Sequence, residues 1–224
     1  MANYPHVLLA LSRYDYRTHR GIAKFAAKHN WHLNCEMAIT GKIPKDWQGD
    51  GIVTLLSDNH ELVNYVTNAD VPFVDLSIMR DDIEAPRVTA DNDAIGKLAG
   101  EYFLQRGYKN YAFYATTTDK VARIRRDNFF EQISSFANTI SDWGISENKK
   151  DWESKISILK NQLLSAQLPI AIFAARDLDA SIALDACIQA NLNVPEQVAI
   201  LGVDNNELIT NSLQVPLSSI NHDV

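Results

Sequence analysis

Short apolar runs alternate with helical segments along nearly the whole chain. The runs hold few charged residues, as do strands that are buried on both faces of a parallel sheet. The pattern predicts strands over 7–12, 31–37, 51–56, 71–76, 110–115, 169–174 and 198–203. It predicts helices over 18–29, 60–69, 91–106, 122–137, 152–166 and 178–191. Such an alternation is typical of an α/β fold, in which parallel sheets are sandwiched between helices.

The strands predicted before Gly107 and after Tyr108 suffice for two separate sheets. We therefore expect two lobes, a C-terminal one of residues 108–216 and an N-terminal one of residues 1–107 plus 217–224. In this interpretation, the extended segment 218–221 returns to the first sheet. Because that return strand stops after a few residues, we expect the N-terminal lobe to be incomplete and the chain to be part of a longer protein.

The charge of the chain argues against nucleic-acid binding by this portion of the protein. The 224 residues carry a net charge of −7, whereas binding to phosphates requires a clustered positive field. The densest basic stretch, 120–126, is bordered by Asp119 and Asp127. We therefore expect any contact with DNA to be made by another part of the protein.

Targeting signals and catalytic motifs are missing from the sequence. No apolar run approaches the roughly 18–20 residues of a membrane span, and the N-terminus does not read as a signal peptide, so we expect a cytoplasmic chain. Cys35 and Cys187 lie in apolar surroundings and are predicted to be reduced core thiols. The histidines show no metal-ligand spacing, and no phosphate cradle or nucleophile motif occurs. We predict no metal, no cofactor and no catalytic residue.

The apolar run 198–203 is followed at once by Asp204 and Asn205. A buried parallel strand places such residues in the crevice at its carboxyl end. A carboxylate and an amide suit a sugar, because each sugar hydroxyl both donates and accepts hydrogen bonds. Asp177 follows the preceding strand 169–174 through Arg176, so we expect Asp177 and Asp204 to face one crevice. Paired carboxylates are also the acid and base of many glycosidases, which stands as an alternative.

Further candidates for this crevice lie on two predicted helices. Asp91 and Asn92 open the helix 91–106, where Asp91 serves as an N-cap, as a ligand contact, or as both. Arg125 and Arg126 lie on the helix 122–137. A guanidinium directed into the crevice would bind ring and hydroxyl oxygens through paired donors; a solvated helix face is the alternative reading.

The first strand-to-helix loop carries Arg13, Tyr14 and Arg17. Ligands of open α/β sheets are held by loops of this kind, so we include all three as candidate binding residues. The loop has no glycine before Gly21, which excludes a dinucleotide-binding fingerprint.

Several stretches resemble the sugar-sensing domain of the xylose-operon regulator (XylR) family, itself similar to the LacI/GalR regulators and to periplasmic sugar-binding proteins. The resemblance runs from about Val7 to the last residue and rests on the order and spacing of the stretches. They are 14–17 with 20–22, 47–52, 86–92, 107–108 with 111–114, 202–208 and 216–219.

The resemblance implies a two-lobed periplasmic-binding-protein-like fold that closes on a sugar, and a dimer. It also implies an AraC-type helix-turn-helix pair downstream, which this sequence does not contain. By position, Asp204 matches the family's ligand carboxylate, followed by Asp91 and Asp177. The family's cleft arginine falls on Arg125, with Arg126 as the alternative.

We therefore predict the sensing domain of a sugar-responsive transcriptional regulator, with D-xylose as the first candidate ligand and operator DNA as the partner of the missing part. A periplasmic sugar-binding protein of a transport system is the alternative. The first loop departs from the family's usual tyrosine–small residue–arginine order, because Asp15 and Tyr16 separate Tyr14 from Arg17. This departure leaves the identity of the sugar open.

Overall fold

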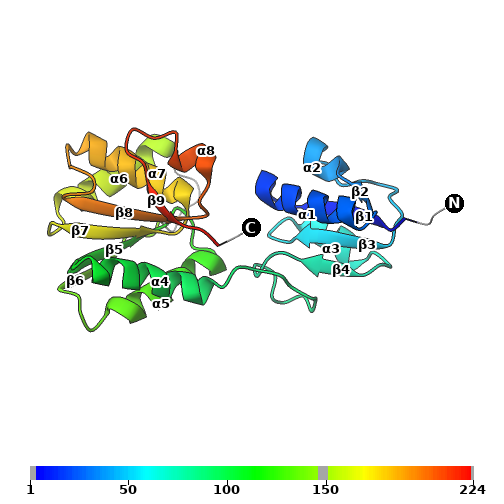
Figure 1. The fold of residues 1–224 in the computed structure, drawn as a ribbon, viewed down its shortest axis with the longest axis horizontal. Coiled ribbons are helices and arrows are strands. Elements are labelled where there is room, and N and C mark those ends of the chain that lie inside the picture. The colour runs from blue at the N-terminus through cyan, green and yellow to red at the C-terminus, as the bar shows by residue number, and fades with distance from the viewer. Residues whose placement is uncertain (1–3, 146–150, 223–224) are drawn as a thin grey trace. The chain divides into compact units, whose positions relative to one another are not determined.

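A computed structural model describes residues 4–145 and 151–222 of the chain. The chain divides into two compact units, one ending at Ala90 and the other beginning at Asp91 (Figure 1). Each unit is an α/β layer structure with its own parallel sheet and its own core. The predicted fold class, parallel sheets sandwiched by helices, is confirmed.

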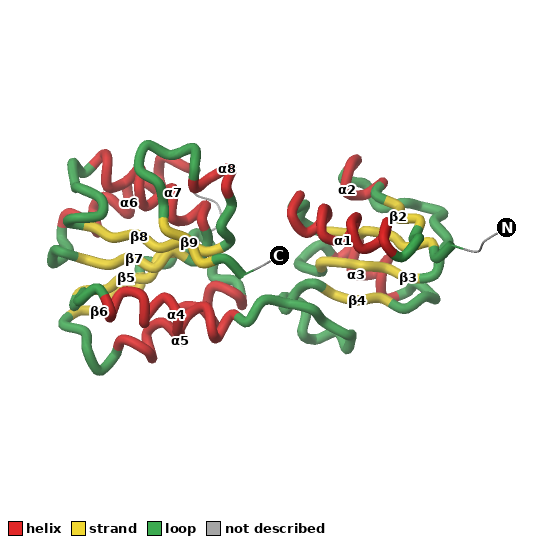
Figure 2. Tube along the Cα trace, in the orientation of Figure 1, coloured by secondary structure: helices red, strands yellow, loops and turns green. Residues whose placement is uncertain are grey.

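The first unit is built on a parallel sheet with the order β2-β1-β3-β4. Helix α1 covers one face of the sheet and α3 the other (Figure 2). Its strands are β1 (His6–Leu11), β2 (His32–Asn34), β3 (Gly51–Leu55) and β4 (Phe73–Asp75), and its helices are α1 (Tyr16–Lys28), α2 (Glu36–Thr40) and α3 (His60–Thr67). The core on the α2–α3 face joins Leu8 and Ile52 of the sheet to Met37 and Leu62 of the helices.

The second unit has a parallel sheet with the order β6-β5-β7-β8-β9. Its strands are β5 (Asn110–Tyr114), β6 (Thr139–Asp142), β7 (Ile170–Ala174), β8 (Val198–Val203) and β9 (Ser218–Ile220). Its helices are α4 (Asn92–Gln105), α5 (Lys120–Ile133), α6 (Trp152–Leu164), α7 (Asp177–Gln189) and α8 (Glu207–Thr210). Helices α4 and α5 cover one face and α6 and α7 the other (Figures 1 and 2).

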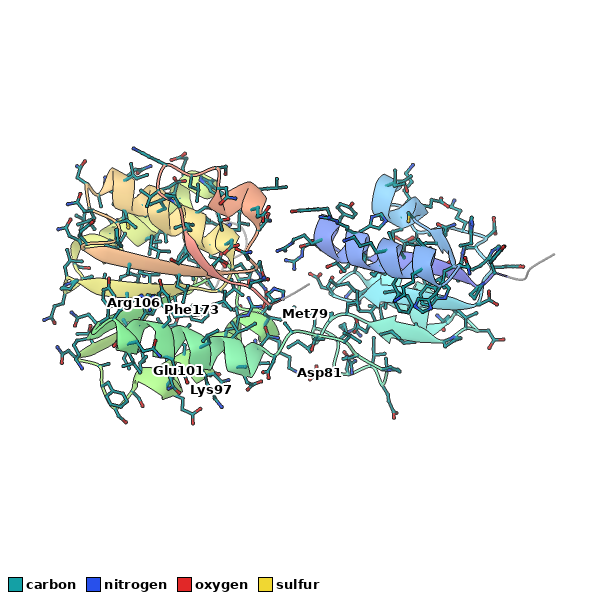
Figure 3. The ribbon with its side chains drawn as sticks, in the orientation of Figure 1. Met79, Asp81, Lys97, Glu101, Arg106 and Phe173 are labelled. Carbon is teal, nitrogen blue, oxygen red and sulfur yellow. The ribbon has the colours of Figure 1, made fainter. Side chains whose placement is uncertain are left out.

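The two faces of the second sheet have different cores, because successive residues of a strand point to opposite faces. On the α6–α7 face the core is mainly aliphatic and includes Ile172, Ile200 and Leu159. On the other face the core is aromatic. It includes Phe173, which is labelled in Figure 3. The centroid of the Phe173 ring lies 5.1 Å from that of Phe129 and 5.6 Å from that of Phe113. All of β5, β7 and β8 is buried, as the uncharged runs predicted.

The boundary between the units differs from the predicted lobes in two places. Segment 92–107 was expected in the first lobe, but α4 packs against α5 in the second unit. The approach is so close that a methyl group at Gly96 would lie 2.5 Å from the carbonyl oxygen of Arg125, and one at Gly100 would lie 2.7 Å from Cγ of Gln132. Glycine at both positions therefore permits the close packing of α4 against α5.

Segment 217–222 was also expected in the first lobe, and this too is wrong. Strand β9 lies parallel beside β8, with Leu201 opposite Ser218 and Val203 opposite Ile220. It thus forms an edge of the second sheet rather than a return strand to the first. The sequence pattern failed here because so short a strand, Ser-Ser-Ile, fits the edge of either sheet.

Candidate ligand-binding site

Polar residues collect at the carboxyl edge of the second sheet. The strands β5, β7 and β8 are parallel neighbours and end at this edge. Thr116, Arg176 and Asp204 follow them, each just past the end of its strand. In open α/β folds, this edge is where ligands bind.

Arg125 of α5 reaches this edge from the face that α4 and α5 cover, and it is 4% exposed. Its Nε donates to Oδ1 of Asn92 at 2.9 Å, and its Nη1 donates to the carbonyl oxygen of Ala175 at 2.6 Å. Burial lowers the pKa of Arg125 to about 10, an effect that the negative charge of Asp204 opposes. The guanidinium therefore remains a cation at neutral pH. It is held in place by these hydrogen bonds and lies close enough to interact electrostatically with Asp204.

Asp204 and Asn205 form a tight turn at the end of β8. Their φ angles are 108° and 45°, in the left-handed region that side chains rarely adopt. The backbone amide of Asp204 donates to the carbonyl oxygen of Ile220 at 3.0 Å, which anchors the turn to β9. The Asp204 carboxylate is a quarter exposed, and its Oδ1 lies 3.0 Å from Nε2 of His222. The turn presents a carboxylate and an exposed amide side chain at the sheet edge.

Asp177 opens α7 next to this turn, but its side chain is fully buried. Its Oδ1 accepts a hydrogen bond from the Ser219 hydroxyl at 2.6 Å, and its Oδ2 accepts one from the Asn206 amide at 2.7 Å. Asp177 thus contacts the residue two positions after Asp204, whereas the prediction that both carboxylates face one crevice stays a prediction. However, the carboxylate is enclosed by α7 and β9, so none of its atoms is accessible for a direct ligand contact.

A second group of polar side chains, which the sequence did not indicate as a site, lies beside Arg125. The guanidinium of Arg176 donates to Oδ2 of Asp119 at 2.6 Å and to Oγ1 of Thr117 at 3.0 Å. Burial alone would raise the pKa of Asp119, but the Arg176 cation and hydrogen bonds from Ala122 and Thr117 outweigh it and lower the pKa. Asp119 is also the N-cap of α5. The sequence did offer a sign of this group: Asp119 follows β5 and Arg176 follows β7, and neighbouring parallel strands end at the same edge.

The structure separates the two candidate arginines. Arg126 points to the outer side of α5, where it pairs with Asp127 at 2.8 Å and with Asp142 of β6 at 3.1 Å. Arg125 is the one that lies with Asn92 and Asp204. Asp91 is the N-cap of α4 and accepts from the Ala94 amide at 2.9 Å, with its side chain at the surface.

Arg13, Tyr14 and Arg17 lie at the carboxyl edge of the first unit's sheet, in the loop between β1 and α1 and the first turn of α1. Arg17 forms a forked ion pair with Asp15, with distances of 2.7 and 3.2 Å. The Tyr14 ring is 54% exposed, and its hydroxyl lies 3.2 Å from Nδ1 of His19. Their part in ligand binding stays a prediction.

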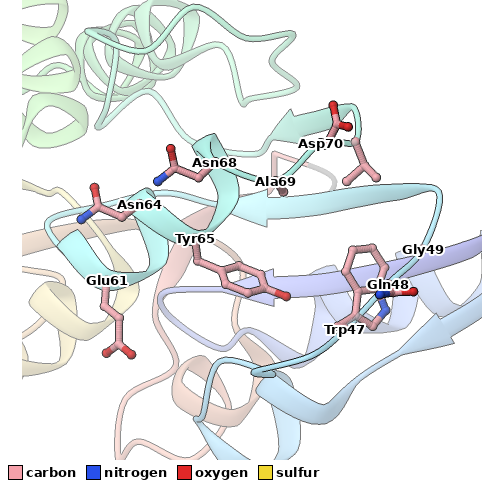
Figure 4. A pocket seen from close by; sticks show the side chains of 10 residues that line it. Trp47, Gln48, Gly49, Glu61, Asn64, Tyr65, Asn68, Ala69 and Asp70 are labelled. Carbon is pink, nitrogen blue, oxygen red and sulfur yellow. The ribbon is translucent and has the colours of Figure 1, made fainter.

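A hollow of about 810 Å³ lies elsewhere on the first unit (Figure 4). It is lined by Trp47 and neighbours that precede β3, and by Tyr65, Asn64 and other residues on and after α3. These segments lead into the amino ends of β3 and β4, so the hollow lies at the sheet edge opposite Arg13. It contains none of the predicted site residues.

Comparison with known proteins places the chain in a family. The family model of the periplasmic binding protein-like domain matches residues 101–224, more than half of the chain. The chain belongs to this family. As one of its members, it has the parallel sheets and flanking helices that the family shares with solved regulators.

Regulators of the xylose operon are among the relatives of this periplasmic binding protein-like domain. The xylose operon regulatory protein of Escherichia coli (strain K12) is 24% identical over 220 residues, which cover 92% of this chain and 56% of the relative. The HTH-type transcriptional repressor PurR of Aliivibrio salmonicida is 28% identical over 163 residues, which cover 71% of this chain and 49% of the relative. The chain thus spans about half the length of the curated relatives it matches.

A solved structure described as the xylose-binding transcription activator xylR superposes with a TM-score of 0.80 at 20% identity. The superposition covers 98% of this chain and 59% of that one. The resemblance to the xylose-operon regulators, noted from the sequence, is therefore confirmed. Among the described residues, no helix is long and apolar enough to span a membrane.

Proposed function

We propose that this domain is the sensing part of a sugar-responsive transcriptional regulator, and that it binds a monosaccharide at the carboxyl edge of the second sheet. The observation that carries the proposal is the grouping of Arg125, Asn92 and Asp204: a buried cation, an amide and a part-exposed carboxylate at one sheet edge. Together they offer fixed donors and acceptors for sugar oxygens.

D-xylose is the first candidate sugar because the Escherichia coli relative is named a xylose operon regulatory protein and the solved xylR structure is described as xylose-binding. In this proposal the sugar stabilises one state of the sensor over another. The free energy by which it shifts this equilibrium equals the difference between its binding free energies for the two states. Operator DNA would be bound by a further part of the protein, and the regulator would act as a dimer. The net charge of −7 fits a domain that does not itself bind DNA.

Isothermal titration of the purified chain with D-xylose, other pentoses and hexoses tests the proposal. We expect saturable heat with one sugar, and the sugar recovered unchanged, since no catalytic role is assigned to these residues. Arg125→Lys and Asp204→Asn should weaken binding about tenfold to a hundredfold. The first substitution removes the forked pair of guanidinium donors and the second removes the charge of the acceptor, and hydrogen bonds to charged groups contribute about 1.5–3 kcal/mol.

Arg126→Lys is the matched control, since Arg126 is the adjacent arginine on α5 and pairs outside the cluster with Asp127 and Asp142. It should bind sugar as the wild type does. Heat with none of the sugars would refute the proposed ligand class. Equal affinities for the Arg125 and Arg126 variants would refute the assigned site. The same titration of variants at Arg13, Tyr14 and Arg17 decides their predicted contribution.

A further inference from the structure

Asp177 connects three segments that are far apart in the sequence. Its Oδ1 accepts from the Ser219 hydroxyl in β9, and its Oδ2 accepts from the Asn206 amide just past the turn. The oxygen of that same Ser219 hydroxyl accepts from the Asn205 amide at 2.9 Å. The start of α7, the edge strand β9 and the Asp204–Asn205 turn are therefore joined through one carboxylate.

Strand β8 lies unusually close to this carboxylate at Gly202. A methyl group at Gly202 would lie 2.3 Å from Oδ1 of Asp177 and 3.3 Å from its Cα. Only glycine therefore lets β8 approach the acid so closely. The side chain of Asp177 is 0% exposed, so solvent does not compete for its oxygens.

The turn held by these hydrogen bonds has an unfavourable backbone conformation. Asp204 and Asn205 both have positive φ, and such residues persist only where the surroundings fix them. The hydrogen bonds from the Asn205 and Asn206 amides to Ser219 and Asp177 supply that constraint. Without them, the turn would relax toward negative φ, and the direction of the Asp204 carboxylate would change.

We propose that Asp177, acting through Ser219, is a positioning residue that holds the Asp204–Asn205 turn in its binding geometry. This inference rests on the proposed function, in which Asp204 contacts the sugar. In this inference Asp177 does not contact the sugar itself but affects binding through the turn that carries Asp204. The buried acid sets the affinity of a site that it does not touch.

Amide hydrogen exchange of the whole chain, measured by NMR without sugar, tests the hydrogen bonds directly. Asp177→Asn loses one acceptor, so the Asn206 amide should exchange about tenfold faster than in the wild type. Ser219→Ala should have the same effect on the Asn205 amide, and it provides a second variant if Asp177→Asn does not fold. Unchanged exchange of both amides would overturn the inference.

Asp179→Asn is the matched control, because Asp179 is also buried in the first turn of α7 but accepts from Thr116 after β5. It should leave the Asn205 and Asn206 exchange rates unchanged. In sugar titrations, Asp177→Asn and Ser219→Ala should weaken binding about tenfold. Asp179→Asn should weaken binding much less than a comparable loss of thermal stability does in the other two variants.

If the loss of affinity in all three variants simply followed the loss of thermal stability, Asp177 would be merely structural and the inference would be overturned. The failure of the proposed function looks different. If the wild type binds none of the sugars, that function fails, and the exchange rates alone then decide whether Asp177 holds the turn.

Discussion

Replacing Gly202 by alanine tests how tightly β8 is packed against the start of α7. The added methyl group would lie 2.3 Å from Oδ1 of Asp177 and 3.2 Å from Cβ of Ala180, well inside van der Waals contact with the acid. Because Asp177 is fully buried and hydrogen-bonded at both oxygens, it cannot swing away at low cost.

The expected loss of stability follows from three contributions. Overpacking a buried site costs about 1–3 kcal/mol, and weakening the bonds of Asp177 to Ser219 and Asn206 adds roughly 1 kcal/mol. Alanine restricts the unfolded chain more than glycine does, which returns about 0.5 kcal/mol. We therefore expect Gly202→Ala to lower the free energy of unfolding of the second unit by about 1.5–3.5 kcal/mol.

Native-state hydrogen exchange of the β8 and α7 amides measures this free energy for the second unit alone, which a global unfolding curve of a two-unit chain does not. Gly21→Ala is the control: Gly21 lies in α1 with open space around its Cα, so alanine should stabilise the first unit by about 0.5–1 kcal/mol.

A double-mutant cycle locates the cause of the loss. In an Asp177→Ala background the clashing oxygen is gone, so Gly202→Ala should cost at least about 1 kcal/mol less than in the wild type. Strict additivity of the two substitutions, or a loss below about 0.5 kcal/mol for Gly202→Ala alone, would refute this account of the contact.

Three further predictions concern the second unit. Phe173→Ala removes a fully buried ring that packs on Phe113 and Phe129, and should cost about 3–5 kcal/mol in chemical denaturation. Burial raises the pKa of Asp179, so the folded state holds its proton more strongly; the resulting stability is present at low pH and is lost as pH rises above the ordinary value of 3.8. Asp179→Asn should lack this part of the pH dependence in denaturation curves from acid to neutral pH, and an unchanged dependence would contradict the reasoning. Asp91→Ala removes the N-cap of α4 and should cost about 1 kcal/mol in thermal unfolding, whereas Asp91→Ser should restore it; a loss of sugar affinity in Asp91→Ser would instead show a ligand contact.

The chain's strand pattern by itself determined the fold class and one edge of the site. Short uncharged runs such as 198–203, alternating with helical segments, are typical of the buried strands of a parallel sheet, and residues after such strands gather at its carboxyl edge. The sequence alone therefore predicts that Asp204 and Asn205 lie at the same edge as the residues that follow β7.

Tertiary packing alone decided which side chains face that edge. Arg125 and Arg126 are adjacent on a helix and therefore point about 100° apart, so the choice depends on how α5 seats against Gly96 of α4. The same holds for Asp177, whose burial comes from the contact with Gly202 and from β9 adding to the second sheet. Local sequence carries no record of these long-range contacts, since they depend on which helix face and which sheet edge meet.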